Sequence, residues 1–298
     1  MKQKDHLRSR IALLVCMIIF GTVGIFRRQI PQIPSGLLAL VRSVLGVAFL
    51  ALVTRIQRKR IGWKSIRKNL PILCLSGAAL GLNWVFLFEA YRYTSVAVAT
   101  LCYYLGPLFV TLVSPLVLKE RLTARKGICM AVVLIGMIPV SGLLDGIGTV
   151  SPLGLTFGLL SALFYACVIL FNKKATGLSP YDKTMTQMAA SAIVVLIYAL
   201  LRERPNASIF DSRSVVLLLV MGILHTGVAY VLYFGAIDRL SAQTVALFSY
   251  IDPIVAILLS VVLLAEPMNV WTGIGAALIL GATLVSELPE RHGIEKKR

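Results

Sequence analysis

Three ionisable side chains lie inside long apolar runs of the sequence: Arg42, Asp252 and His225. A charged side chain at the centre of a bilayer costs roughly 3 kcal/mol on insertion scales, so such residues are candidates for a binding site or an ion pathway. Arg42 could attract a carboxylate, whereas Asp252 and His225 could take part in proton transfer. In the alternative interpretation, Arg42 and Asp252 form an ion pair that only locks two helices together.

The apolar runs also contain prolines, tyrosines and other residues that could shape or line a cavity. Proline removes a backbone donor and frees a carbonyl one turn earlier, so Pro107 and Pro253 predict kinks in two apolar helices. Tyrosines in mid-span need a hydrogen-bond partner, which a cavity would supply, although packing at a kink is the alternative. Asn83, Trp84 and Tyr230 could line the same cavity, but aromatic residues in membrane helices also face lipid or core. The candidate cavity residues are therefore Arg42, Asn83, Trp84, Tyr103, Tyr104, His225, Tyr230, Tyr250 and Asp252.

The elements that carry these residues are predicted to be membrane-spanning helices. Of the 298 residues, 58% are hydrophobic and 14% are charged, whereas soluble domains have about 45–50% apolar and about 25% charged residues. A helix that crosses a bilayer needs about 20 mostly apolar residues. The sequence thus predicts an all-α integral membrane protein with no room for a soluble catalytic or nucleotide-binding domain. The ten predicted spans are 11–28, 35–54, 70–90, 95–118, 125–144, 153–172, 184–201, 214–237, 241–265 and 270–287.

The formal net charge of +17 is distributed unevenly between the two predicted sides of the membrane. Of the 30 Lys and Arg residues, 23 fall at the termini and in the loops of one side, six fall in the opposite loops, and the last is Arg42. Basic residues accumulate in cytoplasmic loops, so both termini are predicted to be cytoplasmic in a multi-pass protein of the inner, or plasma, membrane. The charge therefore indicates orientation and not a nucleic-acid partner.

The sequence contains an internal repeat at a fixed offset of 146 residues. Between 90–136 and 236–282, 13 of 47 positions are identical. The offset predicts two five-helix repeats, residues 1–145 and 146–298. Because five is odd, the second repeat must enter the membrane from the opposite side, which predicts a 5+5 inverted repeat of the kind that transporters use for alternating access. Informative identical pairs are Ser95/Ser241, Tyr104/Tyr250, Pro107/Pro253, Ser114/Ser260, Glu120/Glu266 and Gly127/Gly273.

The order and duplication of these segments resemble the drug/metabolite transporter superfamily, in its ten-helix branch with two EamA-type domains. The resemblance implies a 5+5 carrier of the inner membrane, often an exporter of amino acids or similar metabolites. The chain departs from a symmetric pattern at Met188, which stands opposite Arg42, so any role of the arginine is confined to one half. The segments that carry the resemblance are 33–42, 88–95, 104–107, 118–122 and 127–136, echoed by 161–166, 250–253 and 266–267.

The leading functional hypothesis is a secondary active transporter that exports small organic metabolites such as amino acids around a central midplane cavity. Intramembrane enzymes, channels and non-transporting scaffolds are the alternatives, although no HExxH metal motif supports an enzyme. The five cysteines lie in apolar runs without metal-ligand spacing and are predicted to be packing residues. No cofactor or metal is expected. The expected partners are a small-molecule substrate, membrane lipids and protons as the coupling ion, and the oligomeric state is left open.

Overall fold

The computed structural model is a bundle of helices, and its described residues contain no β-strand. The described residues are 2–106, 109–110, 112–113, 124–140, 151–203, 210–237, 240, 248, 251–266 and 268–287. The helices are α1 (Lys2–Gly21), α2 (Val23–Arg28), α3 (Ser35–Ile56), α4 (Trp63–Tyr93), α5 (Val96–Tyr103), α7 (Ala124–Val140), α8 (Pro152–Lys174), α9 (Pro180–Arg202), α10 (Ser212–Gly222), the π-helical turn η2 (Ile223–Val228), α11 (Ala229–Ile237), α13 (Ile251–Leu264) and α14 (Val270–Glu287).

Six segments of the described chain are long and apolar enough to cross a membrane, and α7, α13 and α14 contribute shorter apolar helices. Each predicted span overlaps at least one helix, but the count of ten stays a prediction, because 114–123, 141–150 and 241–247 lie outside the described residues. The chain is nevertheless a multi-pass membrane protein by its apolar helices. The six long segments are Leu7–Arg28, Ser35–Ile56, Trp63–Tyr93, Pro152–Lys174, Pro180–Arg202 and Ser212–Tyr233.

The predicted helix starts are wrong at α1 and α4. The helix α1 begins at Lys2 and not near residue 11. The predicted spans leave 55–69 as a 15-residue connection, but α4 begins at Trp63 and carries Lys64, Arg67 and Lys68 on its first turns. Hydropathy detects only the apolar part of a helix, and a membrane helix can extend beyond that part into water. The connection between α3 and α4 is accordingly short.

Local sequence signals explain where several helices begin. Ser151 and Ser179 accept hydrogen bonds from the first helical turns of α8 and α9, and each is followed by a proline at the first helical position. Ser95 and Asp211 cap α5 and α10 in the same way. A serine or aspartate side chain satisfies a backbone N–H that lacks an intrahelical partner, and proline lacks that N–H altogether.

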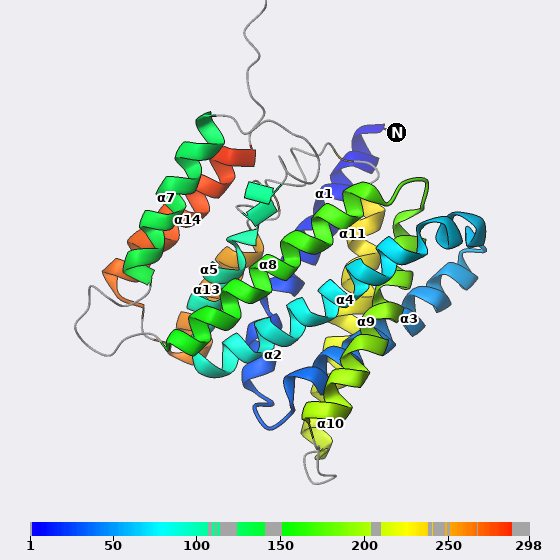
Figure 1. Cartoon of the computed structure of the whole chain (residues 1–298), viewed down its shortest axis with the longest axis horizontal. Helices are drawn as coiled ribbons and strands as arrows, with labels where there is room; N and C mark the ends of the chain where they lie inside the picture. The colour runs from blue at the N-terminus through cyan, green and yellow to red at the C-terminus, as the bar shows by residue number, and fades with distance from the viewer. Residues whose placement is uncertain are drawn as a thin grey trace, which may run out of the picture.

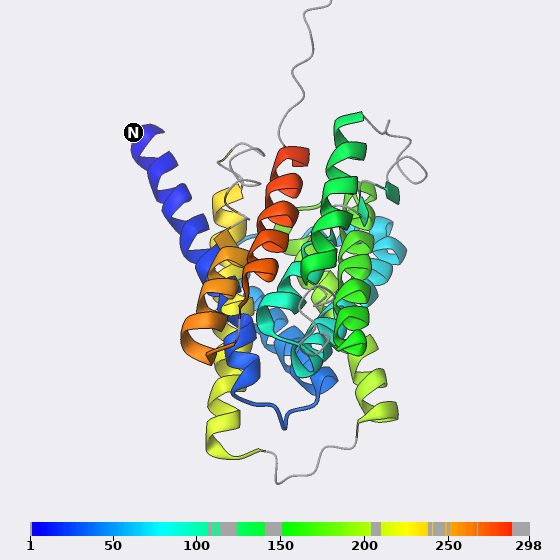
Figure 2. The ribbon, with the colours of Figure 1, turned by 90° about the vertical axis from the view of Figure 1, so that its left-hand side faces the viewer.

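The helices pack in a pattern that brings distant parts of the sequence together. The helix α4 lies against α8 and α9, α3 lies against α9 and η2, and α1 lies against α11 and α13 (Figure 1). The helices α7 and α14 lie side by side at one edge of the bundle (Figure 2). In both views the start of α1 and the last turn of α14 lie at the same end of the bundle.

Glycines allow the closest of these approaches. A Cβ atom on Gly77 would lie 2.4 Å from the backbone oxygen of Gln187, and one on Gly158 would lie 2.6 Å from Cβ of Cys102. The small-residue pairs Gly77/Gly81 and Gly154/Gly158 therefore serve contacts inside the bundle, between α4 and α9 and between α8 and its neighbours.

The helix boundaries repeat at the offset found in the sequence. The helix α2 ends at Arg28 and α8 at Lys174, which are 146 residues apart. Likewise α3 ends at Ile56 and α9 at Arg202. These matched boundaries agree with two repeats of similar helical content.

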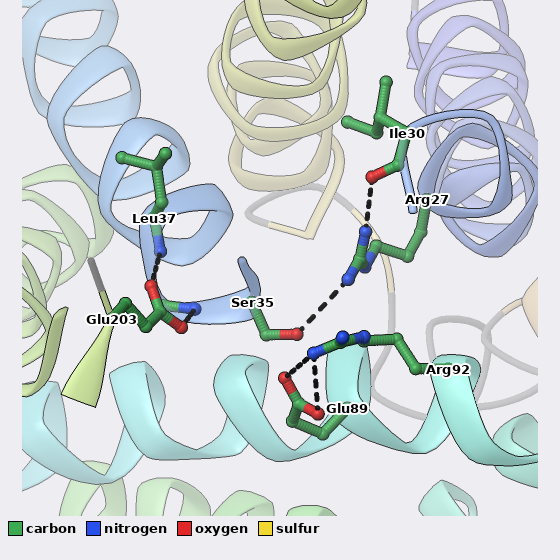
Figure 3. Close-up of polar contacts among 8 residues, drawn as sticks. Arg27, Ile30, Ser35, Leu37, Glu89, Arg92 and Glu203 are labelled. Carbon is green, nitrogen blue, oxygen red and sulfur yellow. Dashed lines mark hydrogen bonds and ion pairs between the residues drawn. The ribbon is translucent and has the colours of Figure 1, made fainter. Parts of the chain in front are cut away.

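One end of the bundle is held by charged side chains that bind helix termini. We call it the Glu266 end. There Glu203, just past α9, accepts hydrogen bonds from the backbone N–H groups of Gly36 (2.7 Å) and Leu37 (2.9 Å) at the start of α3 (Figure 3). Glu266 pairs with Arg28 at 2.9 Å and accepts a 2.8 Å hydrogen bond from the N–H of Val96. These carboxylates replace local caps and join elements that are far apart in the sequence.

Candidate functional site: a buried arginine and a tyrosine-bound aspartate

Arg42 lies in the middle of α3 and is buried, with 4% of its surface exposed. Its Cζ atom lies 4.4 Å from the ring centroid of Trp84 and 5.3 Å from that of Phe88, one turn further along α4. Its Nε atom donates a 3.0 Å hydrogen bond to Oγ1 of Thr226. Among the described residues, its two terminal amino groups make no hydrogen bond. The ring contacts and the Nε hydrogen bond thus fix the guanidinium and leave its two terminal amino groups available for a ligand.

A π-helical turn places the partner of Arg42. In η2, Thr226 donates through Oγ1 to the carbonyl of Met221 at 3.1 Å, five residues earlier, so the hydroxyl is held in place from both sides. A π-helical turn inserts an extra residue into a helix and often marks a functional position. Here it buries both Thr226 and His225 completely.

His225 contacts Thr22 and Phe26 and makes no hydrogen bond to Arg42. Its Nε2 atom lies 2.8 Å from Oγ1 of Thr22, in a hydrogen bond, and its ring packs edge-on against Phe26 at 4.7 Å. Thr22 is the residue that separates α1 from α2. The contact therefore ties the break between α1 and α2 to η2.

Asp252 lies in the first turn of α13 and accepts a 2.8 Å hydrogen bond from the hydroxyl of Tyr104. The ring of Tyr104 packs against that of Tyr103 at 5.6 Å and 88°, and Tyr103 packs against Tyr165 of α8 at 5.2 Å and 59°. Three tyrosines from two regions of the chain thus gather beside one carboxylate.

The alternative interpretation of an ion pair between Arg42 and Asp252 is wrong. The ion pairs that the structure shows in its described part join Arg28 with Glu266 and Arg92 with Glu89. Arg42 is instead held by two aromatic rings and Thr226 in the helix bundle, which leaves Asp252 to Tyr104.

The other predicted site residues have separate placements. Asn83 donates through Nδ2 to the carbonyl (2.7 Å) and Oγ (3.0 Å) of Ser161, so its amide joins α4 to α8. Tyr230 packs its ring against Phe20 at 5.7 Å. Pro253 lies in α13 and is buried, and the predicted kink at this position stays a prediction. Tyr250 and Pro107 lie outside the described residues.

Sequence reasoning missed three residues of this site. Phe88 and Thr226 contact Arg42, and Tyr165 completes the tyrosine cluster. The spacing of Phe88 four residues after Trp84 could have revealed the first, since i and i+4 lie on one helix face. The contact between Thr226 and Arg42 depends on a π-helical turn, which no sequence pattern predicted.

The described part of the chain contains no group of three or more His, Cys, Asp or Glu residues that could hold a metal ion. All five cysteines are free; Cys16, Cys102 and Cys129 are buried as predicted for packing residues, whereas Cys74 is exposed.

Comparison with known proteins decides the family. The model of the EamA-like transporter family matches residues 8–142 and again residues 152–287. The chain belongs to the EamA-like transporter family. This membership confirms the resemblance to the drug/metabolite transporter superfamily, and it makes the chain a transporter by family.

Relatives of this EamA-like chain are similar over nearly their whole length. It is 29% identical over 297 residues to the "Uncharacterized transporter YxxF" of Bacillus subtilis, covering 98% of this chain and 92% of the relative. It is 25% identical over 300 residues to the "Probable amino-acid metabolite efflux pump" of Salmonella typhimurium, covering 96% and 95%. A solved structure titled "Crystal structure of protein" matches with a TM-score of 0.65 at 19% identity, covering 94% and 96%, which supports the fold.

Proposed function

We propose that this EamA-like chain is a secondary active transporter that exports small organic metabolites bearing a carboxylate, such as amino acids. The observation that carries the proposal is the state of Arg42. A guanidinium matches a carboxylate through two parallel hydrogen bonds from its terminal amino groups. These groups make no hydrogen bond within the described structure, although Trp84 and Phe88 hold the guanidinium on its faces.

The proposed mechanism is alternating access around a central midplane site. Two inverted five-helix repeats, 1–145 and 146–298, would exchange conformations and open the site to one side at a time. The ends of α3 at Ile56 and α9 at Arg202, which lie 146 residues apart, support this division. The shared end of α1 and α14 supports the placement of both termini on one side, which the basic loops assign to the cytoplasm of a plasma, or inner, membrane.

Protons are the proposed coupling ion. Asp252 is the candidate carrier, because its carboxylate has a phenol as its hydrogen-bond partner and no cation in the described part of the chain. His225 is a weaker candidate, since Thr22 already occupies one of its ring nitrogens.

The name of the Salmonella typhimurium relative supports an amino-acid-like substrate and export as its direction. At 25% identity this relative suggests a class of substrate rather than a particular one. A transported amino acid would bring the carboxylate that Arg42 is placed to receive.

The test is counterflow in proteoliposomes that contain the purified full chain. A panel of amino acids, their decarboxylated amines and their deaminated acids would be screened with and without an imposed pH gradient. We expect saturable counterflow of at least one carboxylate and a changed rate when the gradient is applied. Conductance without saturation would identify a channel, chemical conversion of a solute without counterflow would identify an enzyme, and either result would reject the proposal. A rate indifferent to the gradient would reject proton coupling alone.

A further inference from the structure

A second recognition element lies beside the Arg42 site. We propose that Asp252, with the rings of Tyr103, Tyr104 and Tyr165, forms a subsite for an organic ammonium group. This inference rests on the proposed function and deepens it, because it makes the substrate a zwitterion. The carboxylate of the substrate would then meet Arg42 and its ammonium would meet Asp252.

The Asp252 carboxylate has an incomplete set of partners. One oxygen accepts the Tyr104 hydroxyl at 2.8 Å, and within the described chain the other oxygen makes no hydrogen bond. No Lys, Arg or His of the described residues lies within 4.0 Å of it. Asp252 is partly buried, and a ligand that brings positive charge and N–H donors would supply partners for its second oxygen.

The tyrosine rings select the kind of cation. Tyr103 stands nearly perpendicular to Tyr104 and is tilted by 59° from Tyr165, so the three rings present differently oriented faces and edges in one small region. The face of an aromatic ring attracts an ammonium group, and such rings are best suited to cations with organic substituents. A calcium or magnesium ion would instead need several oxygen ligands, and the described residues contain no group of three or more His, Cys, Asp or Glu side chains that could supply them.

The two charged groups come from different helices. Arg42 lies in α3 and Asp252 in α13, and they do not pair with each other. A substrate that carries both a carboxylate and an ammonium would offer one group to each of them.

The test uses three probes that share one aliphatic tail. Leucine carries both charges, isopentylamine carries only the ammonium, and 4-methylpentanoate carries only the carboxylate. Binding of each to the detergent-purified full chain would be titrated by saturation-transfer NMR. In Asp252→Asn we expect affinity for isopentylamine to fall about tenfold or more, the size of a lost charge-assisted hydrogen bond. Affinity for 4-methylpentanoate should stay within about threefold of wild type, since Arg42 is untouched.

A matched control is Glu89→Gln, which removes a carboxylate that is already paired with Arg92 at 3.1 Å. It should change neither affinity. If Asp252→Asn does not fold, Tyr165→Leu replaces it and should weaken isopentylamine selectively through the loss of a ring. The subsite is overturned if wild type does not bind isopentylamine, if the variants bind it as wild type does, or if sodium chloride at equal concentration displaces it.

The two proposals can fail separately. Amine binding that depends on Asp252, in a chain that moves no solute in the counterflow screen, would reject transport and keep the subsite. Saturable counterflow in a chain whose amine binding ignores Asp252 would keep transport and reject the subsite.

Discussion

Arg27 and Arg42 are two arginines of similar burial in two different regions. Arg27, at the Glu266 end, is 1% exposed, and Arg42, in the middle of α3, is 4% exposed. Arg27 donates through Nη1 to the carbonyl of Ile30 at 2.7 Å and through Nη2 to Oγ of Ser35 at 3.4 Å (Figure 3). Arg42 uses only Nε on the protein and rests its faces on two aromatic rings.

The difference teaches that burial of a charge does not by itself identify a binding residue. What matters is whether the ends of the side chain are used by the protein. The terminal amino groups of Arg27 hold the turn between α2 and α3, whereas those of Arg42 remain for a ligand. The same distinction separates Glu203, which caps α3, from Asp252, whose second oxygen has no partner in the described chain.

The largest expected loss of stability at the Glu266 end comes from Arg27→Gln. The shorter amide cannot reach the Ile30 carbonyl, and an unsatisfied buried acceptor costs about 2 kcal/mol. We expect a lower unfolding temperature in detergent, with normal counterflow per folded molecule. Arg92→Gln, which removes an exposed partner of Glu89, is the control and should cost less than about 1 kcal/mol. Loss of counterflow in the folded Arg27→Gln protein would contradict the distinction between a structural Arg27 and a ligand-binding Arg42.

Glu203→Ala should have a somewhat smaller effect. It removes two hydrogen bonds to the N-terminal N–H groups of α3, and the loss of a helix cap costs about 1 kcal/mol. Glu203→Gln keeps one acceptor oxygen and should fall between alanine and wild type in unfolding temperature. An unfolding temperature equal to wild type in both variants would show that the cap contributes nothing.

Thr226→Val tests whether the Arg42 region works by positioning. Valine keeps the shape of threonine but cannot accept from Nε of Arg42, so the guanidinium should lose its fixed orientation. We expect KM to rise about tenfold, equivalent to about 1.4 kcal/mol, with the maximal rate less affected. Thr226→Ser restores the hydroxyl and should restore KM. A rise in KM that serine does not reverse would assign Thr226 to packing.

The smallest expected effect is at Asp211, the N-cap of α10. Hydrogen bonds from the hydroxyl and backbone N–H of Ser214 hold the pKa of Asp211 below its ordinary value. Its contribution is therefore complete above the unfolded pKa, near about 4, and is lost as pH falls through the lower folded pKa. In Asp211→Asn, the unfolding temperature should fall less than in wild type when the pH is lowered from about 6 to about 3. An unchanged profile would remove Asp211 from the acid response.

The sequence allowed much of this structure to be predicted because hydropathy and capping are local properties. The apolar runs located the long spans, and the repeat offset of 146 agrees with the ends of α3 and α9. The start of α4 at Trp63 was missed, because its first turns are basic and look like a loop. Arg27 lies at the end of the predicted span 11–28 and was not among the candidate residues, although it is buried.

The site was predicted less completely because it depends on contacts between distant helices. An ionisable residue in an apolar run can be found by inspection, so Arg42 and Asp252 were identified. Their partners were not, because Thr226 reaches Arg42 only through the π-helical turn and Tyr165 reaches Tyr103 only through packing of α8. Asn83 was predicted to line the cavity, but its hydrogen bonds to Ser161 of α8 were not predicted.

The most direct measurement compares counterflow by Arg42→Gln and Arg27→Gln in proteoliposomes that hold equal amounts of folded protein. Glutamine removes the charge and the guanidinium fork at both positions. We predict that Arg42→Gln lowers the transport rate at low substrate at least about 100-fold, as expected when a paired charge contact to the substrate is lost, and that Arg27→Gln stays within about threefold of wild type. Equal counterflow by wild type and Arg42→Gln would contradict the assignment of Arg42 as the carboxylate site.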